Sequence, residues 1–496
     1  MKKYILSAVL LCAFGCEDSI ITGNSRQDGY YAFNSGGFAG EYPEGYSGDR
    51  YNDFVENPFV DVENAPVSTF SIDADGASYA NVRRFLGESQ VPPPGAIRTE
   101  ELINYFPLNY EDDNDGHPIS LNGEVSTCPW EITHKLIRIG IKGKSVPEEQ
   151  LPPSNIVLLI DVSGSMSSPD KLELLKSGFN MLVDEFSNAD RIAIVTYAGS
   201  AGVVLESTPG DQKTKIKSAI TALGSGGSTA GAEGIITAYS IAQKHFIEGG
   251  NNRVILGTDG DFNVGISSQE QLVSLIESKR DAGIFLTVVG VGRGNLNDGM
   301  MEQVANHGNG TYEYIDDAKQ ARKVFVDEFH KFYPAAKDVK IQVEFNPLLV
   351  QSYRLIGYEN RLLEEEDFED DKKDAGEISL GQNITALYEI KPAENSSAFR
   401  LNPTFTIQFR YKHPDADTSI PLALEIFDDG LTFEQSSEHM RFTASVAGFG
   451  LLLRKSQFSG TLTYDNILSW TAGAMTFDPH NRRASFHAVV KKASTL

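Results

Sequence analysis

Cysteine and basic residues are both scarce in this sequence. Its 496 residues include three cysteines, and 43 lysines and arginines against 68 aspartates and glutamates. The net charge of −25 argues against a nucleic-acid partner, because proteins of that class usually present a basic face. A disulfide framework is not expected, since a chain of this length can bury its cores in roughly two or three folding units.

Motifs of the common enzyme classes are also missing. The sequence has no GxxxxGK[ST] phosphate loop, no HExxH zinc motif and no serine nucleophile elbow. The glycine-rich stretch from Gly290 to Gly294 has Asn295 where a dinucleotide loop needs its third glycine. We therefore expect a protein that is not an enzyme and has no small-molecule substrate.

The N-terminus has the pattern of a secretory signal. Lys2 and Lys3 precede an apolar run, residues 4–14, which is too short to span a bilayer. The run leads into Gly15 and Cys16, which resembles a lipobox, so residues 1–16 are predicted to be a lipoprotein signal peptide with Cys16 acylated. The alternative is an ordinary secretory signal. We expect a lipid-anchored protein of the bacterial cell envelope that touches the membrane only through its anchor.

The rest of the chain divides by composition and pattern. Residues 17–57 are rich in Gly, Tyr and Asn and are predicted to be a flexible tether. Residues 58–150 combine a helix with strands, and residues 334–496 are β-rich with a helix at 440–454. Alternating apolar residues predict the strands at 137/139/141, 339/341/343/345 and 405/407/409. Because the two flanks have similar patterns, we hypothesise that they form one β-sandwich.

The central residues, 154–333, alternate between buried strands and amphipathic helices. Residues 156–160 form a continuous apolar run that ends at Asp161, which is typical of a parallel strand covered on both faces. Ser168 and Pro169 are predicted to cap the next helix. The repeated β–α units predict an α/β domain with a doubly wound, Rossmann-like parallel sheet.

Three polar loops follow at strand–helix junctions of this domain. They carry Asp161, Ser163 and Ser165, then Thr229, then Asp259. In a parallel sheet, ligands bind at the carboxyl ends of the strands, so the side chains of these loops are expected to converge. Hydroxyl and carboxylate oxygens suit a hard cation, and neutral hydroxyl ligands leave such an ion electrophilic towards a further carboxylate. The sequence therefore predicts a site that grips rather than catalyses.

The DxSxS stretch at 161–165, with Thr229 and Asp259, resembles the metal-ion-dependent adhesion site of von Willebrand factor type A domains. The resemblance covers about residues 154–333. Residues 68–85 and 353–389 are similar to the flanks of a bacterial subfamily of A-domain lipoproteins. The resemblance implies bound Mg²⁺ (or Mn²⁺ or Ca²⁺), a protein partner that presents an Asp or Glu carboxylate, and a closing helix at 318–332 that shifts when the site is filled.

Other interpretations stay open at this point. A metal-dependent hydrolase needs a general base near the ion, and Asp261 is the one candidate. A structural scaffold would use the metal only to stabilise the loops. Asp73 and Asp75 belong either to a turn or to a calcium loop, and Cys128 is either a buried strand residue or a reactive thiol.

Overall fold

The computed structural model describes residues 48–72, 75–112, 116–198, 200–227, 231–260, 269–373, 375–394 and 402–496. The expectations for Cys16, the tether before residue 48, Asp73, Thr229 and Asp261 fall outside these residues. The last part of the predicted tether, residues 48–57, packs on the folded body, since Asp49 and Tyr51 are buried and Asn57 donates to Gly357 O at 2.8 Å. Cys128 is buried just after a strand, and burial raises the pKa of its thiol, which fits a packing role. Among the described residues, no helix is both long and apolar enough to cross a bilayer.

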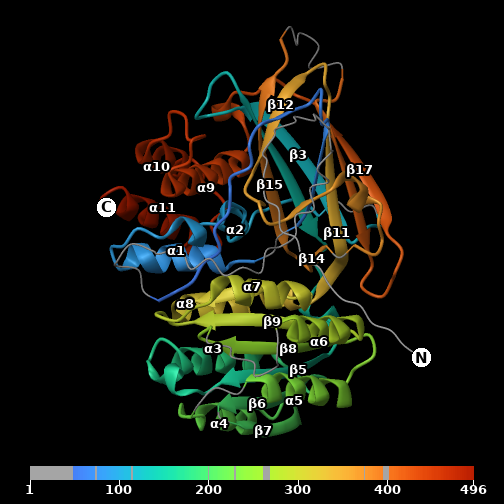
Figure 1. Ribbon diagram of the computed structural model, residues 1–496, viewed down its shortest axis with the longest axis vertical. Coiled ribbons are helices and arrows are strands. Elements are labelled where there is room, and N and C mark those ends of the chain that lie inside the picture. The colour runs from blue at the N-terminus through green and yellow to red at the C-terminus, as the bar shows by residue number, and fades with distance from the viewer. Residues whose placement is uncertain are drawn as a thin grey trace, which may run out of the picture. The chain divides into compact units, whose positions relative to one another are not determined.

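A six-stranded sheet forms the centre of the fold (Figure 1). Its strands are parallel except for the edge strand β7, and each apolar run of the sequence became one of them. Their order is β10 (Tyr312–Ile315), β9 (Ile284–Val291), β8 (Asn251–Thr258), β5 (Ser154–Asp161), β6 (Arg191–Ala198) and β7 (Ser200–Pro209). Every residue of β5 and β8 is buried, as expected for strands covered on both faces.

Helices cover both faces of this sheet, so the predicted doubly wound α/β architecture is confirmed. One apolar core joins alternate residues of β5 to α3 (Leu172–Glu185), α4 (Lys213–Thr221) and α8 (Ala318–Arg322). The other core joins the remaining β5 residues to α5 (Gly231–Lys244), α6 (Gln269–Asp281) and α7 (Asp298–His307). The expected closing helix is broken, since a π turn (Lys323–Asp327) and a 3-10 turn (Phe329–Phe332) follow α8.

Two local predictions in this domain are wrong. Ser168 does not cap the helix after β5, because a 3-10 turn (Gly164–Ser167) comes first and α3 begins only at Leu172. The chain uses the extra residues to keep Ser163 and Ser165 at the strand end. The apolar residues 203–205 predict only a short strand, but β7 runs from Ser200 to Pro209 and is antiparallel to β6, to which it is joined as a hairpin.

Both flanks of the central domain contribute strands to the same two antiparallel sheets, which confirms the sandwich hypothesis. One sheet has the order β1 (Val60–Asp61), β12 (Val350–Ile356), β15 (Asn383–Pro392), β4 (Lys135–Gly143) and β3 (Ile119–Thr127). The other has β13 (Leu362–Leu363), β2 (Val67–Ser71), β11 (Pro334–Phe345), β16 (Phe405–Lys412) and β17 (Ile420–Ile426), with β14 (Gly376–Ser379) beside β11. Alternating residues of β4 and β11 meet in one core.

A helical layer packs beside the sandwich and the edge of the central sheet (Figure 1). It combines α1 (Ala77–Gly87) and α2 (Thr99–Asn104) with α9 (Glu438–Arg454), α10 (Tyr464–Ala472) and α11 (Arg482–Ala493). The helix predicted at 440–454 is α9, whose N-cap is Ser437. α1 contacts the edge strand β10, so this layer also joins the sandwich side of the molecule to the central domain.

Candidate metal centre

Asp161 ends β5 and Asp259 follows the adjacent parallel strand β8, so both aspartates lie at the same edge of the central sheet. Both are fully buried. Ser163 is buried too, whereas Ser165, in the 3-10 turn, is exposed to solvent. The two buried acids therefore lie beside a serine on an exposed turn, at the sheet edge where the strand-end rule places them.

The carboxylate of Asp161 is held from three sides. Its Oδ1 accepts the backbone N–H of Ser163 at 2.9 Å. Its Oδ2 accepts the hydroxyls of Tyr197 at 3.2 Å and Thr258 at 3.1 Å. Burial raises the pKa of Asp161 in spite of hydrogen bonds from Ser163, and the charge of Asp259 adds to the rise. Because the charge of Asp259 opposes the ionisation of the buried Asp161, a cation beside the two acids would be favourable.

Serine hydroxyls complete the described part of the cluster. The Oγ atoms of Ser163 and Ser165 lie 2.9 Å apart, and a hydrogen bond from Ser165 helps to lower the pKa of Asp259. The loop before Thr229 reaches the first loop, since Gly226 N–H donates to Val162 O at 2.7 Å. Gly164 N–H in turn donates to Gly227 O at 3.2 Å. Four of the five predicted site residues therefore lie together.

The sequence did not indicate the residues that hold Asp259. The Nζ of Lys171 lies 2.9 Å from Asp259 Oδ2 and 2.8 Å from Asn295 Oδ1. Burial opposes ionisation of Asp259, but hydrogen bonds from Asn295, Lys171 and Ser165 outweigh it, and the pKa is lowered. Tyr197 and Thr258 were also missed, although each stands near the carboxyl end of a central strand, where the strand-end rule could have found them.

The donor set fits a hard divalent cation. It offers two carboxylates and at least two hydroxyls, the oxygen ligands that Mg²⁺ prefers, and none of the soft sulfur or imidazole ligands that favour zinc or copper. Among the described residues, Asp161, Ser163, Ser165 and Asp259 would hold such an ion. The ion would act as an electrophile towards an oxygen ligand from another molecule.

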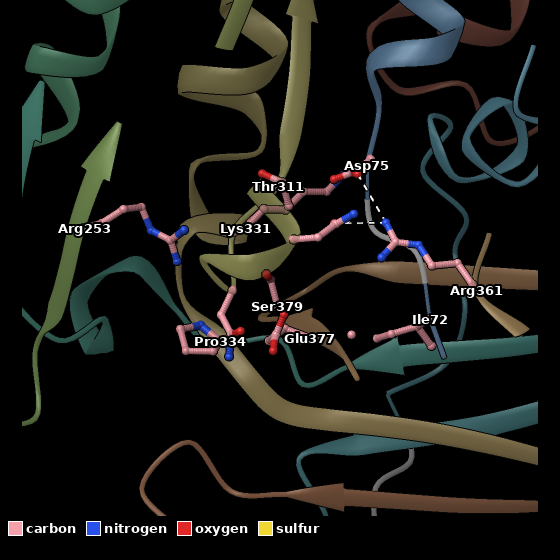
Figure 2. A pocket seen from close by; sticks show the side chains of 13 residues that line it. Ile72, Asp75, Arg253, Thr311, Lys331, Pro334, Arg361, Glu377 and Ser379 are labelled. Carbon is pink, nitrogen blue, oxygen red and sulfur yellow. Dashed lines mark hydrogen bonds and ion pairs between the residues drawn. The ribbon is translucent and has the colours of Figure 1, made fainter. Parts of the chain in front are cut away.

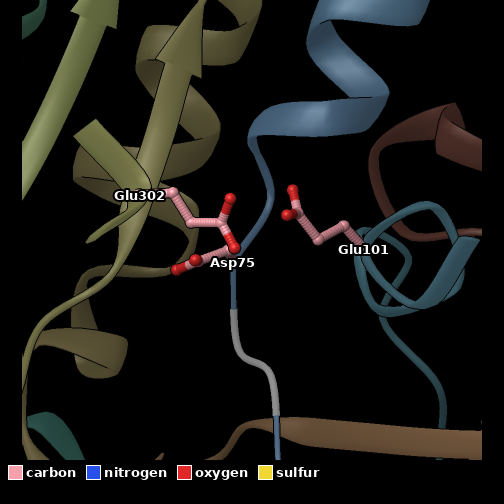
Figure 3. Close-up of side chains that lie close together, drawn as sticks. All are labelled: Asp75, Glu101 and Glu302. Atoms are coloured by element: carbon pink, nitrogen blue, oxygen red, sulfur yellow. The ribbon is translucent and has the colours of Figure 1, made fainter. Parts of the chain in front are cut away.

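A second group of acids lies at the junction of the helical layer and α7 (Figure 3). One carboxylate oxygen from each of Asp75, Glu101 and Glu302 lies within 4.8 Å of the others. Arg98 forms ion pairs with Glu101 and Asp298, and its Nη1 is 3.8 Å from Glu302. This group therefore contains its own arginine counter-charge.

Asp75 is also anchored to the central sheet. Its Oδ1 accepts the backbone N–H of Tyr312 at 2.7 Å, and Arg361 approaches its Oδ2 at 3.5 Å. These contacts tie β10, the segment before α1 and the residues after β12 together. We interpret the group as a structural ion network, and the choice between a turn and a calcium loop at residues 73–75 stays a prediction.

A charged pocket lies near the amino ends of β8 and β10 (Figure 2). Arg253, Lys331 and Arg361 line it together with Asp75 and Glu377. The Arg253 guanidinium donates to Thr287 Oγ1 at 2.8 Å and Phe332 O at 3.0 Å, and burial lowers its pKa to about 10. With its charges nearly balanced, the pocket belongs to the contact between the central domain and the sandwich.

The fold and the cluster define a von Willebrand factor type A domain, and the comparisons agree. The family model described as von Willebrand factor type A domain matches residues 155–327. The model described as von Willebrand factor matches residues 46–138, and the model of the C-terminal region of the uncharacterized protein YfbK matches residues 330–496.

Curated relatives point to the same class. YfbK of Escherichia coli (strain K12) is 40% identical over 467 residues, which cover 90% of this chain and 81% of YfbK. The human inter-alpha-trypsin inhibitor heavy chain H3 is 27% identical over 209 residues, which cover 40% of this chain but 23% of that protein. The chain therefore belongs to the bacterial family of von Willebrand factor type A proteins that includes YfbK.

Solved structures match this chain at lower similarity. A von Willebrand factor type A protein from Catenulispora acidiphila covers 77% of this chain and 91% of its own, with 15% identity and a TM-score of 0.41. The conserved hypothetical protein BatB from Bacteroides thetaiotaomicron covers 36% of this chain and 98% of its own, with 24% identity and a TM-score of 0.31.

Proposed function

We propose that this protein is an adhesion or assembly module of the bacterial cell envelope that binds a partner protein through a divalent cation. Asp161, Ser163, Ser165, Thr229 and Asp259 hold Mg²⁺, and an Asp or Glu carboxylate of the partner supplies a further ligand. The observation that carries the proposal is the joining of two buried aspartates to the Ser163–Ser165 hydroxyl pair at the carboxyl edge of the sheet.

The geometry supports binding rather than turnover. The backbone and neighbouring hydroxyls hold Asp161 fixed, and Lys171 engages Asp259, so neither acid is placed as a mobile proton acceptor. Ser165 is exposed beside these buried acids, which gives a bound ion access to a ligand from outside. An ion held by rigid oxygen ligands and accessible from solvent is suited to binding a carboxylate of another molecule.

The anchor is part of the proposal and rests on the N-terminal sequence. Acylation of Cys16 would hold the folded body at a membrane surface through the part of the predicted tether that precedes residue 48. Labelling of cells with a radioactive or alkyne-bearing fatty acid is expected to mark the wild-type protein and to leave Cys16→Ser unmarked. Equal labelling of both proteins would reject the anchor without affecting the metal site.

Calorimetry with Mg²⁺ on the full chain tests the ion site. Thr229→Ala is expected to weaken Mg²⁺ binding at least about tenfold while the melting temperature without metal is unchanged, because a neutral hydroxyl ligand is lost. Thr221→Ala, at the exposed end of α4, is the matched control and should bind as the wild type does. Mg²⁺ affinity that is the same in Thr229→Ala and the wild type would reject the site.

A peptide array tests the gripping role. Peptides that contain Asp or Glu are expected to retain the Mg²⁺-loaded protein, and the same peptides with Asn or Gln are not. A chelator should abolish retention. If Mg²⁺ binds and raises the melting temperature but retention is the same with and without it, the ion only stabilises the loops, and the scaffold interpretation replaces this proposal.

A further inference from the structure

Lys171 is the one basic side chain in direct contact with the candidate ion site among the described residues. It lies at the N-cap position of α3 and is buried, and its ammonium group is shared between Asp259 and Asn295. A buried ammonium needs an anionic or polar partner, and here that partner is a predicted metal ligand. A divalent cation and this lysine would therefore compete for the carboxylate of Asp259.

The surrounding loop fixes the lysine in this position. Gly292 has a φ of +74°, and a Cβ at this glycine would lie 2.4 Å from Cγ and Cε of Lys171. The absence of a side chain at Gly292 thus makes the channel for the lysine stem. Tyr314 donates its hydroxyl to Gly292 O at 2.6 Å, which holds the wall of that channel in place.

The N-terminal segment holds the same loop from the outside. Asp49 Oδ1 accepts the backbone N–H groups of Gly294 at 2.6 Å and Leu296 at 3.2 Å, on either side of Asn295. Asp49 in turn pairs with Arg84 of α1 at 2.8 Å. These contacts therefore fix the position of Lys171, whereas a lysine on the surface could adopt many conformations.

We propose that Lys171 is a built-in competitor of the divalent cation, which occupies Asp259 in the metal-free protein and keeps the affinity of the adhesion site low. This inference rests on the proposed function. Ion affinity of oxygen sites follows the charge of the ligand set, and the lysine reduces two negative charges to a net of one. An ion must compensate for the lost Lys171–Asp259 contact when it binds.

The direct test is calorimetry with Mg²⁺ alone on the full chain carrying Lys171→Met. The variant is expected to bind Mg²⁺ at least about tenfold more tightly than the wild type, since a neighbouring positive charge is removed. Lys176→Met is the matched control, because Lys176 is on the same helix and has the same charge but pairs with the exposed Glu173. Its affinity should stay within about twofold of the wild type.

A second pair of variants displaces the lysine without changing any charge. Gly292→Ala drives a methyl group into the lysine stem, and Gly294→Ala places the same backbone strain, at φ +93°, where no atom lies within 4 Å of the new Cβ. Gly292→Ala is expected to bind Mg²⁺ more tightly than Gly294→Ala. This pair keeps the test decisive if Lys171→Met does not fold.

The outcomes separate this inference from the proposed function. If the wild type binds Mg²⁺, and Lys171→Met and Gly292→Ala bind it with unchanged or weaker affinity, the competitor role is overturned. The proposed ion site would still stand. Binding by Lys171→Met but none by the wild type supports the competitor and rejects the proposed function for the native protein. No binding by any of these proteins overturns both.

Discussion

Two clusters of buried acids in this molecule are neutralised in different ways. Asp161 and Asp259 have one lysine as their counter-charge, and their other described partners include the hydroxyls of Tyr197 and Thr258. Asp75, Glu101, Asp298 and Glu302 surround Arg98 and Arg361. An arginine fork donates in several fixed directions and can satisfy two carboxylates at once, whereas an ammonium group is a compact charge that leaves other oxygens for another cation.

The difference indicates how to tell a structural acid cluster from an ion site. The arginine cluster joins segments from three parts of the chain and lies inside a contact between layers. The lysine cluster lies at the carboxyl ends of β5 and β8, and Ser165 beside it is exposed to solvent. The number of acidic residues alone would favour the arginine cluster as a metal site. The pair of Asp161 and Asp259 is nevertheless the better candidate, because its counter-charge is a compact ammonium group and not an arginine fork.

The largest expected effect comes from breaking the arginine cluster. Arg98→Met should lower the free energy of unfolding by about 3–5 kcal/mol, because it leaves buried carboxylates without their counter-charge. Chemical denaturation measures this, with Arg293→Met, an exposed arginine paired with Glu88, as the control. If the cluster were a second cation site, millimolar Mg²⁺ or Ca²⁺ would restore the lost stability, and we expect no such rescue.

His330 is expected to contribute to the loss of stability in acid. Burial, with the nearby charges of Lys331 and Lys142, lowers the pKa of His330 to about 4. The unfolded histidine binds a proton below about pH 6.5 and the folded one does not, so His330 makes stability fall as pH drops from about 6.5 to 4.

Replacement of His330 isolates this contribution. His330→Gln should reduce the loss of stability between pH 7 and pH 4 by about 1 kcal/mol, a value discounted for partial exposure. His413→Gln, at an exposed position, should leave the profile as it is. Denaturation midpoints at a series of pH values give the comparison, and identical slopes in all three proteins would show that the acid loss lies elsewhere.

The smallest expected effect tests the contact between the N-terminal segment and the lysine loop. Asp49→Asn weakens the hold on the loop at 292–297 and should raise Mg²⁺ affinity by about twofold, since the lysine then fixes Asp259 less firmly. Asp53→Asn, which is exposed nearby, serves as the control. Calorimetry that finds tighter binding in Asp49→Asn than in Lys171→Met would contradict the order of these effects.

Much of the central domain could be predicted because its signals are local. Continuous apolar runs identify buried parallel strands, and residues just after them must lie at one edge of the sheet. That reasoning brought Asp161, Ser163, Ser165 and Asp259 together before any coordinates. It did not find α10 and α11, whose apolar faces are matched to other helices of the layer and show little independent periodicity.

The parts that were missed depend on contacts between distant residues. Lys171 and Asn295 meet only because the turn after β5 and the loop after β9 are folded against each other, and a single lysine in a sequence gives no sign of its partner. The start of α3 was predicted wrongly for the same reason, because it depends on contacts that the local sequence does not show. Ser168 and Pro169 favour a helix start by themselves, but the structure uses a 3-10 turn to keep two serines at the strand end.

The interleaved sandwich has a consequence for the order in which the chain can fold. β3 and β4 pair with each other as a hairpin, but β2 pairs with β11 and β13, and Phe70 meets its neighbour Ile341 only across the whole central domain. Until β11 is available, β2 has no partner and exposes a sheet edge prone to wrong pairing. The strands of the central domain all come from one continuous stretch of sequence. This domain is therefore expected to fold first and to bring the two halves of the sandwich close to each other.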